Sequence, residues 1–330
     1  MSELRLNVIT REWVVIATER ALRPDQFKHE SSAQVPIIFD QACPFCPGNE
    51  EHTPGELLRF PASRDWQVRV VPNKFSALSK QTEQNHNHEG LHHSVSGYGL
   101  HEVVIESEMH NHFLAEQSLS AISNLLQTFK TRFIAMYEDP AIAHVTIFKN
   151  HGEDAGTSLI HPHSQIIGTP ITPIQIRDRL DAGKRYFEDT GKCLMCATLA
   201  DELAEQSRII FDTTHFTTFI PFAALSPFHT WIFPKRHSAC FADISDDEIT
   251  ELALHLKTIL SKLYSGLNNP SYNFVLRSES PRASEPECFH WYISIVPRLS
   301  RPAGFELGSG MYINTSIPED SAAFLRNIIV

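Results

Sequence analysis

The sequence lacks any apolar run of the ~18 residues that a membrane-spanning helix requires. Its first residues, MSELRLNVITREW, lack the apolar core of a secretory signal, so a cytoplasmic location is expected. Positive charge is also scarce, because 28 Lys and Arg stand against 39 Asp and Glu, which gives a formal net charge of −11. We therefore expect no general binding of long nucleic acids or anionic membranes, although a local phosphate pocket remains compatible with this charge.

Cysteine is scarce too, but its placement is informative. Four of the six cysteines form two C-x-x-C pairs, Cys43–Cys46 and Cys193–Cys196. In a reducing compartment such pairs indicate metal thiolates more readily than disulfides, with a redox pair or chance as the alternative for a single pair. The next candidate histidine ligands lie 64 and 41 residues further on, which is too far for a nucleic-acid-binding zinc finger with about 12 intervening residues.

The order of motifs repeats along the 330 residues, a length that suits about two domains. Each half contains a C-x-x-C pair, a histidine, an amphipathic helix, a strand, a polar loop and a second histidine before an apolar run. The intervals agree, because 51 residues separate His110 from His161 and 53 separate His237 from His290. The sequence therefore predicts a duplicated chain.

Hydrophobic periodicity locates the main elements. Apolar residues spaced by three and four predict helices at about 119–137 and 245–264, followed by strands at 144–149 and 272–276. We predict an α+β protein of two similar halves, 1–180 and 181–330, joined near Pro170, Pro173 and the charged stretch 177–184. Each half is expected to hold an antiparallel sheet with one face open to a ligand. Residues 84–93, QNHNHEGLHH, are expected to form a solvated mobile loop, with loose metal binding as the alternative.

The segment His161-Pro-His163-Ser-Gln165 carries the strongest chemical signal. Alternate residues of a strand share a face, so two imidazoles and a carboxamide would point the same way. That combination does not suit an apolar core, although a pair of structural histidines is the alternative. The preceding polar loop supplies Asn150, Gly152, Gly156 and Ser158. Backbone amides in such a loop suit phosphate oxygens.

On these residues the sequence resembles the galactose-1-phosphate uridylyltransferase family, the transferase branch of the histidine-triad superfamily. HPHSQ matches the active-site motif of that branch, and the resemblance covers nearly the entire chain. Further matching segments lie at 11–24, 43–50, 71–78, 101–107, 231–237 and 290–310. The resemblance implies two histidine-triad-like halves related by a pseudo-two-fold axis.

The resemblance also implies a double displacement. UMP would pass between UDP-glucose and galactose 1-phosphate through a uridylyl-histidine. The alternatives are an ADP-glucose phosphorylase, which passes AMP to inorganic phosphate through the same histidine, and a histidine-triad hydrolase. His163 would be the nucleophile, and Gln165 would donate a hydrogen bond to a phosphoryl oxygen. The implied substrate contacts are Arg20 and Arg23 for phosphate or nucleotide, Asn73 and Phe75 for base and ribose, and Asn150 and Ser158 for the phosphates. Solvated surface charge is the alternative for the arginines. The segment 304–310 would contact the hexose phosphate.

The resemblance assigns the first Cys/His set to zinc and suggests a homodimer. That set is Cys43, Cys46, His110 and His161. With four protein ligands such a site is closed and structural, and it would hold His161 two residues from the nucleophile. The second set, Cys193, Cys196, His237 and His290, is predicted to bind a second zinc, with iron as the alternative. Because His290 aligns with His161, Tyr292 stands where the nucleophile would be. We therefore expect only the first half to be catalytic, since tyrosine has a pKa near ~10.

Overall fold

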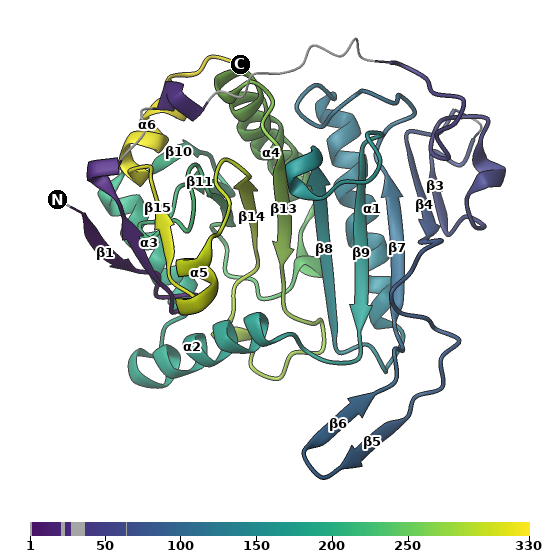
Figure 1. Cartoon of the computed structure of the whole chain (residues 1–330), viewed down its shortest axis with the longest axis horizontal. Coiled ribbons are helices and arrows are strands. Elements are labelled where there is room, and N and C mark those ends of the chain that lie inside the picture. The colour runs from purple at the N-terminus through teal and green to yellow at the C-terminus, as the bar shows by residue number, and fades with distance from the viewer. Residues whose placement is uncertain (1, 21–23, 28–36, 64) are drawn as a thin grey trace.

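The structure is a computed structural model that describes residues 2–20, 24–27, 37–63 and 65–330. Its main element is one sheet of ten strands, and every neighbouring pair in it is antiparallel (Figure 1). In spatial order the strands are β3 (Leu58–Phe60), β4 (Val68–Pro72), β7 (Leu100–Ile105), β9 (His163–Thr169), β8 (His144–His151), β13 (Tyr272–Arg277), β14 (Tyr292–Pro297), β12 (Thr230–Pro234), β11 (Phe216–Phe219) and β10 (Ile209–Asp212).

The sheet confirms the predicted duplication. Along the chain, α1 (Leu119–Tyr137) connects β7 to β8, and α4 (Asp246–Leu267) connects β12 to β13 at the equivalent position. Outward from the central pair β8 and β13, the two halves repeat the same order of strands in opposite directions. The chain is thus an α+β protein whose halves share one continuous sheet. The division at residue 180 stays a prediction, and it falls inside the helix α2 (Ile174–Thr190).

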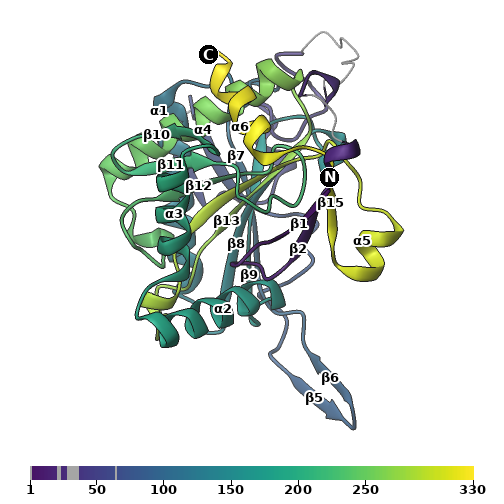
Figure 2. The same cartoon turned by 90° about the vertical axis from the view of Figure 1, so that its left-hand side faces the viewer.

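Helices α1 and α4 cover one face of this sheet and form the main core with it (Figure 2). Their bounds agree with the helices predicted from periodicity. Ser118 caps α1 by accepting a hydrogen bond from the backbone amide of Ala121. Ser245 and Glu248 form a complete capping box at the start of α4. Each cap stabilises its helix by about 1 kcal/mol.

The opposite face is covered differently in the two halves. In the first half, Phe45 and Trp66 pack on β4 and β7, and a pocket remains beside His163. In the second half it is covered by α2, α3 (Leu194–Glu205) and a small sheet of β1 (Glu3–Leu6), β2 (Trp13–Ile16) and β15 (Tyr312–Asn314). Trp231, Phe233 and Tyr292 pack there against residues of α2 and α3. The expectation of an open face in both halves is therefore wrong for the second half, because its strands present large apolar side chains that need cover.

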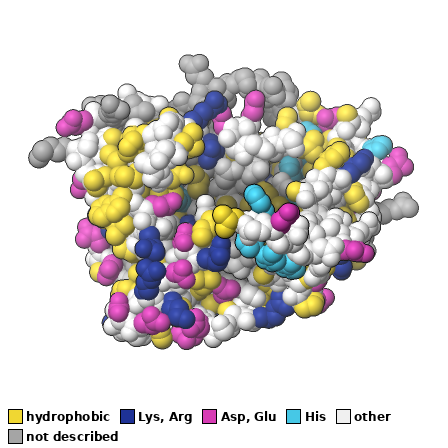
Figure 3. Space-filling view, turned by 60° about the horizontal axis from the view of Figure 1, so that its bottom comes forward, with side chains coloured by type: hydrophobic (Ala, Val, Ile, Leu, Met, Phe, Trp, Pro, Cys, Tyr) yellow, Lys and Arg dark blue, Asp and Glu magenta, His cyan; other side chains and the backbone are white. Residues whose placement is uncertain are grey.

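Two further segments differ from expectation. Residues 84–93 do not form a mere loop, because β5 (His86–Glu89) and β6 (His92–Val95) pair as a hairpin that projects from the body of the molecule (Figures 1 and 2). Histidine side chains gather on the surface at this end of the molecule (Figure 3). Residues 304–310 contain the short helix α5 (Gly304–Ser309), and α6 (Pro318–Asn327) follows. None of the described helices is long and apolar enough to cross a membrane.

Candidate active site and metal clusters

A pocket of about 300 Å³ lies where β8 ends and β9 begins. It brings together His161, His163, Asn150, Gly152 and Ser158, all of which the sequence singled out. The rest of its lining is Phe113, Lys149, His151, Glu153, Thr157, Leu159, Ile160, Pro162 and Asn269. Gln165 and Gly156 are not among the lining residues.

The ring of His163 is held in one orientation. Its Nδ1 atom lies 2.9 Å from the backbone carbonyl oxygen of His161. A carbonyl can only accept, so Nδ1 carries the proton and the lone pair lies on Nε2. Burial lowers the pKa of His163 below its ordinary value. The nitrogen that can attack an electrophile is therefore Nε2.

The polar loop turns sharply at its two glycines. Gly152 (φ 80°) precedes the short 3-10 turn Glu153–Ala155, and Gly156 (φ 83°) ends it. Both values lie in the left-handed region, where glycine alone adopts the conformation without steric cost. Ser158 follows this turn and faces the pocket. The loop thus brings backbone close to His163, as an anion-binding loop requires.

Gln165 belongs to a neighbouring polar chain on the same face of the sheet. Its Oε1 atom lies 2.7 Å from Nε2 of His101, and that nitrogen lies 3.0 Å from Nδ2 of Asn73. Asn73 Oδ1 accepts a hydrogen bond from the backbone amide of Phe75. The Phe75 side chain is 87% exposed, so it does not belong to a formed pocket.

A buried ion pair lies behind the strand that carries His163. Lys149 Nζ lies 2.6 Å from Glu106 Oε2, and the two side chains are 1% and 0% exposed. The same ammonium donates to the backbone carbonyl of His163 at 3.2 Å, and Ser164 Oγ donates to the other oxygen of Glu106. The sequence interpretation missed this pair. One feature of the sequence could have predicted it. The apolar runs 144–149 (HVTIFK) and 101–106 (HEVVIE) each end in a charged residue, and the two charges are opposite.

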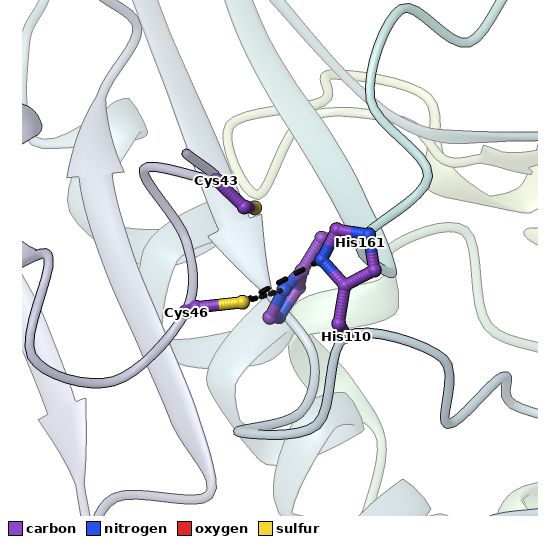
Figure 4. A group of neighbouring side chains, drawn as sticks. All are labelled: Cys43, Cys46, His110 and His161. Carbon is purple, nitrogen blue, oxygen red and sulfur yellow. Dashed lines mark hydrogen bonds between the residues drawn. The ribbon is translucent and has the colours of Figure 1, made fainter. Parts of the chain in front are cut away.

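All four residues of the first Cys/His cluster are buried, and their side chains point toward one another (Figure 4). His161 also lines the pocket. One ligand atom from each of Cys43, Cys46, His110 and His161 lies within 4.8 Å of all the others. Cys46 Sγ is 3.5 Å from Nδ1 of His110 and 3.6 Å from Nδ1 of His161. A zinc tetrahedron with the usual Zn–S and Zn–N lengths has S···N edges of about 3.5 Å.

The histidine tautomer also suits a cation in this cluster. His161 Nε2 lies 2.8 Å from the carbonyl oxygen of Ser107, so Nε2 donates and Nδ1 presents its lone pair to the thiolates. Because the carbonyl of the same residue holds Nδ1 of His163, His161 connects the cluster directly to the ring of His163. Phe45 adds a second link, since its ring packs edge-on against both imidazoles.

The second cluster has the same construction but is more exposed. Cys196 Sγ lies 3.2 Å from Nδ1 of His237 and 3.3 Å from Nδ1 of His290, and Cys193 completes the set. His237 is exposed and Cys196 is half-buried, at the edge of a second pocket. Both clusters could hold a metal ion.

Tyr292 occupies the position equivalent to His163 and is buried. Its side chain is 1% exposed, and its hydroxyl accepts a hydrogen bond from Arg179 of α2 at 3.1 Å. The second half therefore has a buried, hydrogen-bonded tyrosine at the position where the first half has His163.

The predicted phosphate arginines are only partly described. The backbone of Arg20 forms the end of a 3-10 turn, Thr18–Arg20. Arg23 lies outside the described residues.

Comparison with known proteins covers nearly all of the chain. Residues 1–173 match the N-terminal domain of galactose-1-phosphate uridyl transferase, and residues 179–299 match the C-terminal domain. An ADP-glucose phosphorylase from Arabidopsis thaliana is 37% identical over 99% of this chain and 93% of its own. A galactose-1-phosphate uridylyltransferase from Thermotoga maritima is 29% identical over 99% of this chain and 98% of its own. Among solved structures, the Arabidopsis thaliana ADP-glucose phosphorylase with bound ADP-glucose has a TM-score of 0.84 at 33% identity, covering 100% of this chain and 99% of that one.

Proposed function

The chain belongs to the galactose-1-phosphate uridyl transferase family, and we propose that it transfers a nucleotide from a nucleotide sugar through a covalent bond to His163. One observation supports this most strongly. The carbonyl of His161 fixes the proton of His163 on Nδ1, which leaves the lone pair on Nε2, and His163 lines a pocket of about 300 Å³.

The first step is a displacement at phosphorus. The Nε2 lone pair attacks the α-phosphorus, the bond from phosphorus to the bridging oxygen breaks, and sugar 1-phosphate leaves with the electron pair. The ring then carries the nucleotide on Nε2 and its original proton on Nδ1. The carbonyl of His161 stabilises the positive charge that develops on this ring.

The second step reverses the first with a different acceptor. An oxygen of the incoming phosphate attacks the same phosphorus, the P–N bond breaks, and its electron pair returns to Nε2. One phosphate linkage is exchanged for another, so the protein mainly has to position the groups and stabilise charge. Asn150 and Ser158 line the pocket, and Gln165 lies two residues from His163 on the same face of β9. We assign these three side chains to the phosphoryl oxygens.

Zinc fits the donor set of the first cluster, and we propose it there and, with iron as the alternative, in the second. With two thiolates and two imidazoles the first ion would have four protein ligands, so it would supply structural support and no open coordination position. Its contribution would be to keep His161, and through the His161 carbonyl the ring of His163, in place.

For the substrates we favour ADP-glucose as donor and inorganic phosphate as acceptor. The support is the higher similarity to the Arabidopsis thaliana ADP-glucose phosphorylase, at 37% identity, than to the Thermotoga maritima uridylyltransferase, at 29%. This reverses the order given to the two activities on the sequence. Exchange between UDP-glucose and galactose 1-phosphate is the second candidate, supported by that 29% relative. The homodimer and the cytoplasmic location stay predictions.

Parallel assays separate the candidates. The protein is incubated with ADP-glucose and phosphate, or with UDP-glucose and galactose 1-phosphate, and the nucleotide products are measured. We expect ADP and glucose 1-phosphate from the first mixture at the higher rate. Without acceptor, quenching in alkali and mass spectrometry should find a nucleoside monophosphate on His163. An unmodified His163 peptide, or net hydrolysis in place of transfer, would contradict the proposal.

A further inference from the structure

The pocket beside His163 lies where the two halves meet, and the second half supplies part of its wall. Asn269, just after α4, lines the pocket, and its Oδ1 lies 2.8 Å from Nε2 of His151. Asn268 and Asn269 have φ values of 59° and 51°. Asparagine adopts this left-handed conformation more readily than most residues, and here it ends α4, because Asn268 is the C-cap of that helix.

Strand β13 of the second half also holds the polar loop from behind. It pairs with β8 so that Asn273 lies opposite Asn150 and Tyr272 lies opposite His151. Nδ2 of Asn273 lies 2.9 Å from Oδ1 of Asn150 and 2.9 Å from the carbonyl oxygen of Ala155. One side chain of the second half therefore contacts both the end of β8 before the turn and the last residue of the 3-10 turn.

These two hydrogen bonds determine the orientation of the Asn150 amide. The carbonyl of Ala155 can only accept, so the Asn273 atom that faces it must be the amide nitrogen. The same nitrogen faces the Asn150 side chain, so the Asn150 atom that meets it must be the oxygen. The two N–H bonds of Asn150, which lines the pocket, are thereby left for a ligand in the pocket.

The second half also restricts which residue type can occupy position 152 of the loop. A Cβ atom added there would stand 2.9 Å from Cβ and 3.0 Å from Cα of Ser271. The first distance is shorter than real Cβ contacts and the second is tighter than nine in ten of them, and the φ of 80° disfavours residues with a side chain as well. Ser271 and Asn273 thus enclose the loop on the side away from the pocket.

We propose that the second half, which lacks a nucleophile, serves as the scaffold of the phosphate loop, with Asn273 as the positioning residue that turns the N–H groups of Asn150 toward the phosphates of the nucleotide sugar. This inference rests on the function proposed above. Asn273 acts through Asn150 and is not itself among the residues that line the pocket.

The test is a double-mutant cycle on binding. All variants carry His163→Asn, so that ADP-glucose and UDP-glucose bind without reacting, and the affinity is measured by calorimetry. In Asn273→Leu, the side chain remains uncharged and keeps a shape similar to that of asparagine, but it can no longer donate a hydrogen bond. We expect it to weaken binding of the preferred nucleotide sugar at least tenfold. In an Asn150→Ala background it should change the affinity less than twofold, because the group it orients is gone.

Two further variants serve as controls. Asn124→Leu makes the same change on α1, where Asn124 bonds to Gln67 and not to the pocket, and should bind like its parent. Asn273→Ala replaces Asn273→Leu if thermal unfolding shows that the leucine variant is not folded.

The outcomes are distinct. An equal loss of affinity in both backgrounds would overturn the positioning role in favour of general support of the loop through Ala155. An unchanged affinity of the Asn273 variants would overturn it as well. If the parent binds neither nucleotide sugar and wild-type protein forms no adduct at His163, the proposed function fails, and this inference fails with it.

Discussion

Backbone carbonyl groups decide which nitrogen of each key histidine is available. The carbonyl of Ser107 leaves Nδ1 of His161 to the metal cluster, and the carbonyl of His161 leaves Nε2 of His163 to the pocket. The two rings therefore use opposite nitrogens, although they lie two residues apart. A side-chain partner could reorient during a reaction, whereas these two carbonyls belong to the backbone next to strands β9 and β7.

Replacing His163 by glycine should abolish turnover, because no other side chain in the pocket offers a neutral imidazole in this tautomer. We expect the fold and both metal clusters to persist, since His163 is not a member of either cluster. The measurements are nucleotide exchange, adduct mass and metal content of the purified variant. Normal exchange by His163→Gly would contradict the assignment.

Gln165→Ala should slow nucleotide transfer by about 10²–10³, the cost of losing one donor to a developing oxyanion. Binding of the nucleotide sugar should change much less, because the interaction matters mainly in the transition state. Single-turnover rates and calorimetric affinities separate the two effects. Equal losses in both quantities would assign Gln165 to ground-state binding.

The buried pair of Lys149 and Glu106 should couple strongly. Removing one partner, by Lys149→Met or Glu106→Gln, leaves an uncompensated buried charge and should lower the free energy of unfolding by about 3–5 kcal/mol. The double variant should lose less than the sum of the two single losses. Urea unfolding of the four proteins measures this coupling, and additive losses would show that the two charges act independently.

Between elements, the contact of α4 with β11 contains a titratable group. His255 of α4 is fully buried, and its ring nitrogens lie 2.8 Å from Thr213 Oγ1 and 2.7 Å from Thr218 Oγ1. Burial lowers the pKa of His255 to about 4, although Glu251 and Asp212 act in the opposite direction. Folding therefore disfavours the protonated ring.

Stability should consequently fall on acidification in a defined window. Above pH 6.5 the His255 ring is neutral in the folded and unfolded chains and contributes nothing. Between 6.5 and about 4 only the unfolded chain takes up the proton, so at pH 5 His255 should cost about 2 kcal/mol of unfolding free energy. His255→Asn should reduce the difference between pH 7 and pH 5 by this amount. The matched control is His92→Asn in the exposed hairpin, and an equal difference in both variants would contradict the assignment.

The elements predicted best were those with strong periodicity. Helices α1 and α4 bury one continuous apolar face and begin at serine caps, so local sequence determines them. The hairpin of β5 and β6 was missed because all eight of its strand residues are exposed, which leaves no alternation of apolar and polar residues. Helix α5 was missed because glycine, which disfavours helices, starts it.

The sequence singled out residues of unusual chemistry that the structure brings together, and it missed contacts that depend on tertiary pairing. Two C-x-x-C pairs and HPHSQ announce their ligands and nucleophile in any context, and the structure brings each set together. Asn273 and Lys149 are ordinary residues of a strand, and their partners lie 123 and 43 residues away. Only the register of the strands reveals such contacts.

At the scale of the molecule, the two Cys/His clusters differ in exposure although their motifs repeat in the sequence. All four residues of the first cluster are buried, whereas His237 of the second is exposed and Cys196 is half-buried. A chelator therefore reaches the second cluster directly and the first only after local opening.

Metal should accordingly leave in two steps. With excess EDTA we expect the second cluster to lose its ion first, with adduct formation at His163 preserved, and activity to decline only when the first ion is lost. Metal analysis and activity are followed in the same samples. Cys196→Ser identifies the fast step, because that variant should lack it. Simultaneous loss of both ions, or early loss of activity, would contradict this order.

The pairing of β8 with β13 has a consequence for synthesis on the ribosome. Before β13 exists, β8 is the unprotected edge of the first half's sheet, and at 5–20 residues per second Tyr272 follows His151 by about 6–25 s. An exposed edge strand invites pairing with other nascent chains. Lys149, an inward-pointing charge on that strand, is the kind of residue that discourages such pairing. The lysine behind His163 can thus also protect the growing polypeptide from aggregation until its second half is synthesised.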